Sequence, residues 1–345
     1  MPETCRQIRL ARRPRGAPMA GDFELARVPV PTPGAGQVLT RTVYLSLDPY
    51  MRGRMNAEKS YAAPVPIGGV MEGGAVSVVE ASKAEGLAVG DIVVGRTGWQ
   101  DYAVSDAAGL RKVDPAAGPI STAVGVLGMP GMTAYTGLLT IGQPKAGETL
   151  VVAAASGAVG SAVGQIGKIK GCRVVGVAGG PEKCRYVADA LGFDACIDHR
   201  AEDFEAQLAA ACPKGIDIYF ENVGGRVLEA VIPLLTFFSR MPVCGQIAHY
   251  NMTTLPDGPN RLPQLMRAVL SNRVRIQGFI VSDFADQQAD FLRDMGQWVR
   301  DGRIKYREHR VKGLENAPAT LIGLLKGENF GKVVVEVSDD PTQGR

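Results

Sequence analysis

The sequence has 345 residues, of which 46% are hydrophobic and 21% charged, and its formal net charge is +3. A single hydrophobic core rarely grows to this length, so we expect two domains. The composition is that of an ordinary globular protein, and the small net charge argues against a nucleic acid or a membrane as partner. No apolar run approaches the roughly 18 residues of a membrane span, which predicts a cytoplasmic protein.

Six cysteines and three histidines are spread along the chain without the spacing of a metal site. No two cysteines form C-x-x-C, and the histidines lie far apart in the sequence. We therefore expect free thiols in a reducing compartment and no zinc site. Arginines cluster near the N-terminus, but an apolar core segment and a cleavage pattern are missing, so a transit peptide is not predicted.

Residues 1–124 predict a compact, β-rich domain. The predicted strands span 23–28, 37–45, 70–80 and 91–94. Glycine and proline turns separate these short strands, which is typical of a barrel-like arrangement. Loops of this domain carry the polar and aromatic stretch Asp48–Met55 and the pair Ser60-Tyr61. Loops often carry function, but surface turns with incidental tyrosines are the alternative.

From Val126 onward, strands and helices alternate, beginning with a helix at 129–139 that follows a Pro-Gly turn. The predicted strands are 150–155, 172–178, 195–197, 216–220, 241–247 and 274–281, and the helices between them centre near 163, 186, 205, 228 and 266. This alternation predicts an α/β fold with a doubly wound parallel sheet, which binds ligands at the carboxyl ends of its strands. Polar residues follow three of the strands, at Glu221-Asn222, 246–250 and Ser282-Asp283.

After residue 286 the pattern leaves the parallel sheet. It predicts an amphipathic helix to Arg300, a strand at 306–311, a helix at 318–325 and a last strand at 332–337. We expect this segment to return to the β-rich domain. The predicted domains are therefore 1–124 with 286–345, and 125–285, with the reaction site in the cleft between them.

The stretch 151–161 predicts a dinucleotide site. Its apolar strand runs into a turn in which Gly157 permits a sharp bend and Gly160 keeps bulk away from a pyrophosphate. The following helix would offer free N–H groups and its positive dipole end. The first glycine of G-x-G-x-x-G is Ala155 here, so a purely structural turn is the alternative. The next strand completes a βαβ unit of about 30 residues, which favours the dinucleotide.

The end of the next strand favours NADP(H) over NAD(H). The strand ends in Gly179-Gly180 without the carboxylate that would bind a ribose 2′-hydroxyl, and Lys183 and Arg185 follow. Glu182 lies between these cations in the sequence. A cationic pocket suits a 2′-phosphate, although a solvated first helical turn is the alternative.

Six motifs occur in a distinctive order: Asp48–Met55, Gly128–Tyr135, Ala154–Ser161, Glu221–Gly225, Arg275–Phe279 and Lys326–Lys332. Together they resemble the zinc-independent medium-chain dehydrogenase/reductases, in the group of prostaglandin, curcumin and plant 2-alkenal (double-bond) reductases. The resemblance covers nearly the whole chain. It implies a GroES-like domain, a Rossmann domain, NADPH as hydride donor, and reduction of the C=C bond of α,β-unsaturated aldehydes and ketones. Zinc-containing relatives carry Gly-His-Glu, whereas residues 67–72 contain no histidine.

The same resemblance implies the roles of individual residues. Lys183 would bind the 2′-phosphate, and His199, at a position that is usually tyrosine in mammalian members, would bind nearby in a pH-dependent way. The residues implied at the pyrophosphate are Gly157, Ala158, Val159, Gly160 and Ser161. Those implied at the nicotinamide half or its riboses are Asn222, Cys244, Gly245, Gln246, Ile247, Tyr250, Phe279, Ile280, Val281 and Asn329.

The mechanistic hypothesis is hydride transfer to the β-carbon of an enone, which gives an enolate. The nicotinamide ribose hydroxyl and Tyr50, Tyr61 or Tyr250 would hold the enolate oxygen, and solvent or one of these phenols would protonate the α-carbon. Packing or cofactor contact is the alternative role for each tyrosine. Ser271 replaces a tyrosine that is proposed in relatives to steady the enolate, so the proton donor stays open.

Two other functions are compatible with the same motifs: an NADPH:quinone reductase, and a non-catalytic NADPH-binding redox sensor. The strand at 274–281 is apolar and last in its sheet. An edge strand of this kind favours pairing with a second subunit, so we expect a homodimer.

Overall fold

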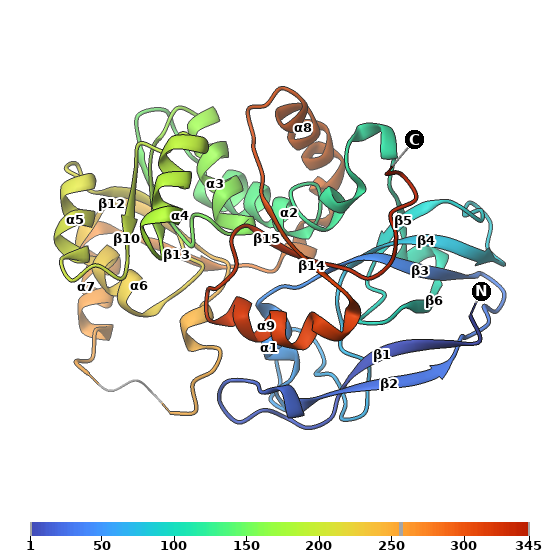
Figure 1. Cartoon of the computed structure of the whole chain (residues 1–345). Helices are drawn as coiled ribbons and strands as arrows, with labels where there is room; N and C mark the ends of the chain where they lie inside the picture. The colour runs from blue at the N-terminus through green and yellow to red at the C-terminus, as the bar shows by residue number, and fades with distance from the viewer. Residues whose placement is uncertain (1, 255–257, 344–345) are drawn as a thin grey trace. The chain divides into compact units, whose positions relative to one another are not determined.

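The computed structural model describes residues 2–254 and 258–343, which form two compact units. The first unit comprises Met1–Gly125 and Glu308–Arg345, and the second comprises Val126–Arg307 (Figure 1). In the described part of the chain, no helix combines the length and apolar character that crossing a membrane requires. All six cysteines lie in the described ranges and carry free thiols.

The second unit is built on a six-stranded parallel sheet with the strand order β10-β9-β8-β11-β12-β13. The strands are β8 (Thr149–Ala153), β9 (Arg173–Ala178), β10 (Ala195–Asp198), β11 (Ile216–Phe220), β12 (Leu235–Val243) and β13 (Arg275–Gly278). Successive strands step outward from β8 in one direction and then from β11 in the other. The expected doubly wound sheet is therefore confirmed, and its topological switch point lies between β8 and β11.

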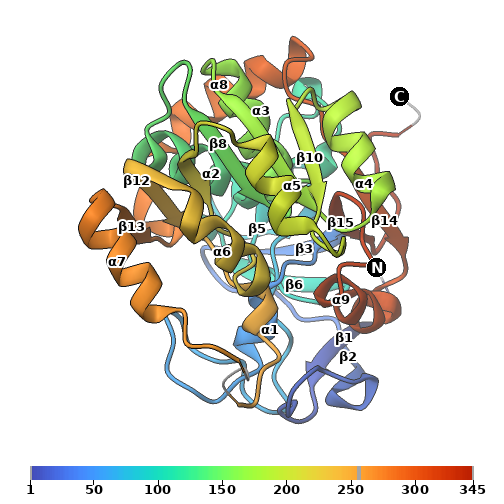
Figure 2. The ribbon, with the colours of Figure 1, turned by 90° about the vertical axis from the view of Figure 1, so that its left-hand side faces the viewer.

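Helices cover both faces of this sheet (Figure 2). One face packs against α2 (Met129–Thr136), α3 (Ala158–Ile169), the continuation of α4 (Pro181–Arg185) and α8 (Gln288–Arg300). The other face packs against α5 (Phe204–Ala211), α6 (Gly225–Val231) and α7 (Leu262–Asn272). The strands between them are buried on both sides, which explains their continuous apolar sequences.

Helix α8 belongs to the second unit. Its Phe291 and Trp298 pack near the ring of Tyr135 in α2, with ring centroids 5.9 and 6.2 Å away. The hydroxyl of Tyr135 also donates to Asp294 at 2.7 Å. The sequence pattern places a domain boundary before this helix, whereas the unit extends to Arg307 because the apolar face of α8 is buried against α2.

Strand β12 begins six residues earlier than the predicted strand at 241–247. Ile216 of β11 pairs with Leu235, and Ile218 pairs with Arg240, so residues 236–239 bulge out of the ladder. The aromatic rings of Phe237 and Phe238 are exposed in this bulge. A strand with such a bulge has no regular alternation of apolar and polar residues, so the sequence pattern does not reveal its first half.

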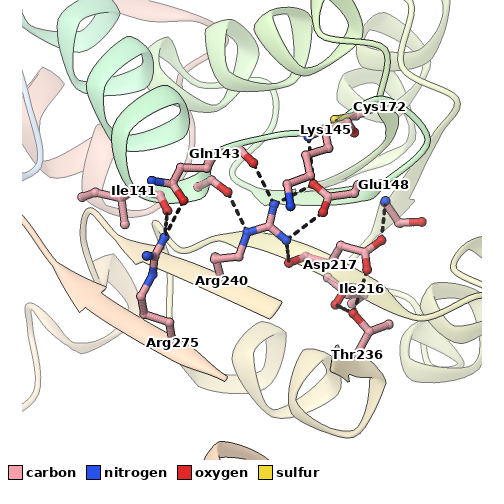
Figure 3. A network of polar contacts seen from close by, with 12 residues as sticks. Ile141, Gln143, Lys145, Glu148, Cys172, Ile216, Asp217, Thr236, Arg240 and Arg275 are labelled. Atoms are coloured by element: carbon pink, nitrogen blue, oxygen red, sulfur yellow. Dashed lines mark hydrogen bonds and ion pairs between the residues drawn. The ribbon is translucent and has the colours of Figure 1, made fainter. Parts of the chain in front are cut away.

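The amino ends of the strands are held by a network of polar contacts (Figure 3). Arg240 pairs with Glu148 at 2.6 Å and donates to the carbonyls of Gly142 and Gln143 at 2.8 and 2.9 Å. Asp217 accepts from the N–H of Thr149 at 2.8 Å. The network therefore ties the turn after α2 to the start of the sheet.

The first unit contains a seven-stranded sheet with the order β14-β15-β3-β4-β5-β7, in which β6 pairs with β3, and a separate β1-β2 ribbon. The strands are β1 (Thr4–Leu10), β2 (Phe23–Pro29), β3 (Gln37–Ser46), β4 (Ala75–Ser82), β5 (Ile92–Gly95), β6 (Tyr102–Asp106), β7 (Arg111–Lys112), β14 (Glu308–Lys312) and β15 (Lys332–Glu336). Two helices are α1 (Tyr50–Arg54) and α9 (Ala317–Leu325). The expected β-rich character is confirmed, but the sequence does not predict β1, β6 or β7, and β4 starts after Gly73-Gly74 rather than at Val70.

Candidate functional site

The glycine turn lies at the carboxyl end of β8, beside the switch point. Ala154 adopts a left-handed conformation with φ of +53°, and its carbonyl accepts from the N–H of Gly157 at 2.9 Å. A Cβ on Gly160 would lie 2.3 Å from the same carbonyl oxygen. Only glycine fits at position 160, so the turn brings its backbone N–H groups and the start of α3 close to any ligand above it. The five predicted pyrophosphate residues, 157–161, are contiguous in this turn, and the tight turn fits that group.

Cationic side chains gather at the tips of β9 and β10. A Cβ on Gly179 would lie 2.9 Å from Nε2 of His199 and 3.2 Å from Nε of Arg200. Asp198 Oδ1 accepts from the N–H groups of Gly180 and Arg200, both at 2.9 Å, and so ties the two strand ends together. Arg200 was not predicted as a site residue, although its position directly after a strand that ends at this edge was a usable signal.

Two of these basic side chains have lowered pKa values. Burial and then the charge of Arg200 lower the pKa of the Lys183 amine, and the same two causes, in the same order, lower that of the His199 imidazole. An anion bound among them would relieve the repulsion between the cations. The residues present therefore fit a 2′-phosphate, as the sequence predicts.

A second group of predicted residues meets beyond β11 and β12. The amide nitrogen of Asn222 donates to the carbonyl of Ala153 at 2.8 Å, which places it against the glycine turn. The N–H of Ile247 donates to the Asn222 carbonyl at 3.3 Å. The hydroxyl of Tyr250 accepts from the N–H of Gln246 at 3.4 Å. This loop, which we call the 244–250 loop, also contains Cys244 and Gly245, and burial raises the pKa of the Cys244 thiol to about 12.

The three predicted residues after β13 differ in their surroundings. Phe279 is buried, with its ring edge-on to Phe220 at 6.2 Å. Ile280 and Val281 are half-buried. Ser271, at the position of the relatives' tyrosine, is exposed near the end of α7.

In the first unit, one arginine organises two of the predicted tyrosines. The guanidinium of Arg54 lies 4.1 Å from the ring centroid of Tyr61 and 5.8 Å from that of Tyr50. Arg54 is only 3% exposed and pairs with Glu72 at 2.6 Å. Tyr61 is 58% exposed, and burial raises the pKa of both the Tyr50 and the Tyr61 phenol. Both phenols are hydrogen-bond donors that lie against one buried cation. No local sequence pattern indicates these contacts of Arg54.

A buried ion pair supports the loop that carries Tyr50. Lys332 Nζ lies 2.9 Å from Asp48 Oδ1 and donates to the carbonyl of Leu47 at 2.7 Å. Both charged side chains are less than a tenth exposed. Asn329, in the same C-terminal motif, donates to the carbonyl of Gly331 at 2.8 Å. Tyr50, Tyr61 and Asn329 thus lie in the first unit, and the other predicted site residues lie in the second.

Metal ligands do not gather in the described residues. Within 2–254 and 258–343, no group of three or more His, Cys, Asp and Glu side chains is placed to hold a metal ion. The stretch 67–72 contributes Glu72, which pairs with Arg54.

Comparisons with known proteins match both parts of the chain. The family model for the N-terminal domain of oxidoreductase matches residues 6–113, and the model for zinc-binding dehydrogenase matches residues 158–298. The NADPH-dependent curcumin reductase of Escherichia coli (strain K12) is 61% identical, and the match covers 96% of each chain. The 2-alkenal reductase (NADP(+)-dependent) of Nicotiana tabacum is 39% identical, over 96% of this chain and 97% of that one.

A solved structure is similarly close. The crystal structure of CurA from Vibrio vulnificus in complex with NADPH superposes with a TM-score of 0.94 at 57% sequence identity. The match covers 97% of this chain and all of that one. The likeness therefore extends through both units.

Proposed function

Because the chain belongs to the medium-chain dehydrogenase/reductase family, in the group of curcumin, prostaglandin and 2-alkenal reductases, we propose that it is an NADPH-dependent enone reductase. It reduces the C=C bond of α,β-unsaturated ketones and aldehydes, and is thus an oxidoreductase acting on CH–CH groups. The observation that carries this proposal is the 61% identity, over 96% of the chain, to an enzyme named for NADPH and curcumin. Independent support comes from the glycine turn and the cationic cluster, which suit a phosphorylated dinucleotide.

Three groups of residues at the carboxyl edge of the sheet hold the cofactor. Lys183 and Arg200 bind the 2′-phosphate through their charges, which repel each other in its absence, and the imidazole of His199 lies beside them. The turn at 157–161 binds the pyrophosphate through backbone N–H groups. Asn222 and the 244–250 loop orient the nicotinamide half. When bound, the reduced nicotinamide supplies a hydride to the β-carbon of the substrate.

Phenol side chains stabilise the charge that develops on the substrate. The carbonyl oxygen gains negative charge as the β-carbon gains hydride, and a hydrogen bond from a phenol lowers the energy of that state. Tyr61 is exposed and its ring lies on Arg54, and Tyr50 lies against the same cation. The hydroxyl of Tyr250 lies within the 244–250 loop, next to the N–H of Gln246. A phenol or solvent then delivers a proton to the α-carbon, which completes the saturated carbonyl product.

The reaction proceeds without zinc in our proposal. The stretch 67–72 has no histidine, and its one carboxylate is committed to Arg54. Hydrogen bonds then replace a metal ion in stabilising the oxygen. We also place the enzyme in the cytoplasm, a compartment that keeps its six thiols reduced.

We propose a homodimer that forms along the edge strand β13. This strand is outermost in its sheet, and Ile276 on it is partly exposed. Phe237, Phe238 and Leu270 add exposed apolar surface on the elements next to β13. Light scattering coupled to size-exclusion chromatography should give twice the chain mass, and a monomer at micromolar concentration would refute the dimer.

Side-by-side turnover tests the proposed function. We expect consumption of NADPH with a 2-alkenal and an enone, and a smaller kcat/KM with a benzoquinone. Faster turnover of the quinone would favour a quinone reductase. NADPH binding without turnover of either class would favour a redox sensor.

Replacing Tyr50, Tyr61 and Tyr250 singly by Phe identifies the phenol that holds the oxygen. Loss of a transition-state hydrogen bond should lower kcat by about tenfold or more for that residue. Unchanged kinetics in all three variants would remove tyrosine from the mechanism and leave the ribose hydroxyl and solvent.

A further inference from the structure

Glu221 is a fully buried acid at the carboxyl end of the sheet, directly after β11. Its side-chain Oε1 accepts hydrogen bonds from the N–H groups of Val223 and Gly224 at 2.6 and 2.9 Å, and from the hydroxyl of Tyr219 at 3.1 Å. Glu221 itself is 0% exposed. The carboxyl group therefore clamps the turn that follows β11 from the inside.

The backbone of Glu221 holds the neighbouring loop as well. Its carbonyl accepts from the N–H groups of Cys244 and Gly245 at 2.9 and 3.2 Å, and its own N–H donates to Pro242 at 3.0 Å. The N–H of Ala248 donates to the carbonyl of Val223 at 3.0 Å. The clamped turn is thus the support on which the 244–250 loop rests.

Two glycines give the clamped turn its shape. Gly224 and Gly225 both have positive φ, of +77° and +55°, and the imidazole of His249 packs so close that a Cβ on Gly224 would lie 2.8 Å from its Cε1. The N–H groups of Val223 and Gly224 point inward at this turn, and the carboxyl group of Glu221 accepts both. A loosened turn would move Asn222, which immediately precedes it.

The second carboxyl oxygen of Glu221 is buried at a cost in stability, so a contribution to stability alone does not explain an acid at this position. Oε2 of Glu221 is buried and has no hydrogen-bond partner among residues 2–254 and 258–343. Burial raises the pKa of this carboxyl group. An apolar side chain would avoid that cost, but it could not hold the two N–H groups.

We propose that Glu221 is a positioning residue for the nicotinamide half of the cofactor. It acts through Asn222 and the 244–250 loop and touches no reacting atom. The amide nitrogen of Asn222 donates to the carbonyl of Ala153, so its Oδ1 is the atom that can accept a hydrogen bond from the cofactor. The turn held by Glu221 sets the direction in which this oxygen points. This inference rests on the proposed function, because it assumes that NADPH is the ligand of this edge.

Two ligands separate the nicotinamide half from the adenosine half. NADPH fluorescence titration measures the whole cofactor, and competition with 2′,5′-ADP measures the adenosine phosphate end alone. In the full-length E221A protein we expect NADPH affinity to fall about tenfold to thirtyfold, while 2′,5′-ADP affinity stays within about twofold of the wild type. E221Q keeps an acceptor for the two N–H groups and should restore NADPH affinity to within about threefold of the wild type.

Kinetics give a second readout that a merely structural role would not move. The E221A protein should show a lower kcat for the enone as well as a higher KM for NADPH, because a misplaced nicotinamide slows hydride transfer. The control is Glu148→Gln at the opposite edge of the same sheet. It should lower the melting temperature and leave both affinities unchanged.

Several results would overturn the inference. They are unchanged NADPH affinity in folded E221A, an equal loss of affinity for NADPH and 2′,5′-ADP, and failure of E221Q to rescue. If E221A does not fold, E221D is used instead, since it withdraws the carboxylate by one methylene and should show the same selective loss to a smaller degree. Failure of the proposed function is a separate result, in which the wild type itself does not bind NADPH.

Discussion

The two edges of the parallel sheet in the second unit differ in how their polar groups are satisfied. At the amino edge, the guanidinium of Arg240 is saturated by Glu148 and by backbone carbonyls (Figure 3). At the carboxyl edge, Lys183 and His199 have lowered pKa values, and Oε2 of Glu221 lacks a partner among the described residues. The same strands therefore end in a closed structural network on one side and in an arrangement suited to a charged ligand on the other.

Because of this difference, we expect ligand binding and folding stability to depend on different edges of the sheet. A change at the amino edge should cost folding free energy and leave ligand affinity alone. A change at the carboxyl edge should cost affinity first.

The largest effect is expected for Gly160→Val at the carboxyl edge. A Cβ at this position would lie 2.3 Å from the carbonyl oxygen of Ala154, so the turn must open and its N–H groups must move away from the pyrophosphate. NADPH affinity should fall by about 100-fold or more in a fluorescence titration. Gly109→Ala is the control, because a Cβ there meets nothing within 4 Å. Retained affinity in Gly160→Val would contradict the assignment of the turn.

The amino edge is tested by Arg240→Ala. Its loss leaves Glu148, whose side chain is 18% exposed, without its cation, and removes a donor from the carbonyls of Gly142, Gln143 and Asp217. We expect a loss of about 3 kcal/mol in the free energy of unfolding, measured by urea denaturation. Arg293→Ala removes the two ion pairs of an exposed arginine, with Asp290 and Asp294, and should change little. If NADPH affinity of the folded Arg240→Ala protein fell instead, the two edges would not be separable.

The choice between NADPH and NADH is tested by Lys183→Ala. A charge-assisted bond to the 2′-phosphate should contribute enough that NADPH affinity falls by about tenfold to 100-fold while NADH affinity is unchanged. Arg185→Ala is the matched control, since this arginine lies two residues away on the same helix and is exposed. Equal losses for both cofactors would point to a structural role for the lysine.

The smallest expected effect is a pH dependence that arises from His199. Burial and Arg200 lower the pKa of its imidazole from the ordinary value of 6.5, so the ring is neutral at pH 7 in the free protein. A bound 2′-phosphate favours the protonated ring and raises that pKa, so binding takes up a proton and tightens as the pH falls. We expect NADPH affinity to rise about twofold to fivefold from pH 8 to 6, beyond the change seen in His199→Gln. Identical pH profiles of the two proteins would exclude the imidazole from the site.

The regular elements were predictable where local pattern and tertiary packing agree. Strand β11 was placed correctly because it is a short apolar run buried on both faces. The bulge at 236–239 was not, because its exposed phenylalanines break the usual period. Helix α8 was predicted, but only the buried contacts of Tyr135 with Phe291 and Trp298 assign it to the second unit.

The candidate site was predictable as far as it lies on contiguous motifs. The glycine turn and Lys183 follow directly from the βαβ unit. Arg200, Arg54 and the clamp formed by Glu221 depend on contacts between strand ends or loops that are distant in sequence. Such contacts have no local pattern, so only the structure reveals them.

The most direct test follows the hydride itself. NADPH that carries deuterium at both C4 positions of the nicotinamide is incubated with the enzyme and a 2-alkenal, and the product is examined by NMR. We predict a saturated aldehyde with deuterium at the β-carbon. Deuterium at the carbonyl carbon of an unsaturated alcohol, or no transfer at all, would contradict reduction of the C=C bond by this protein.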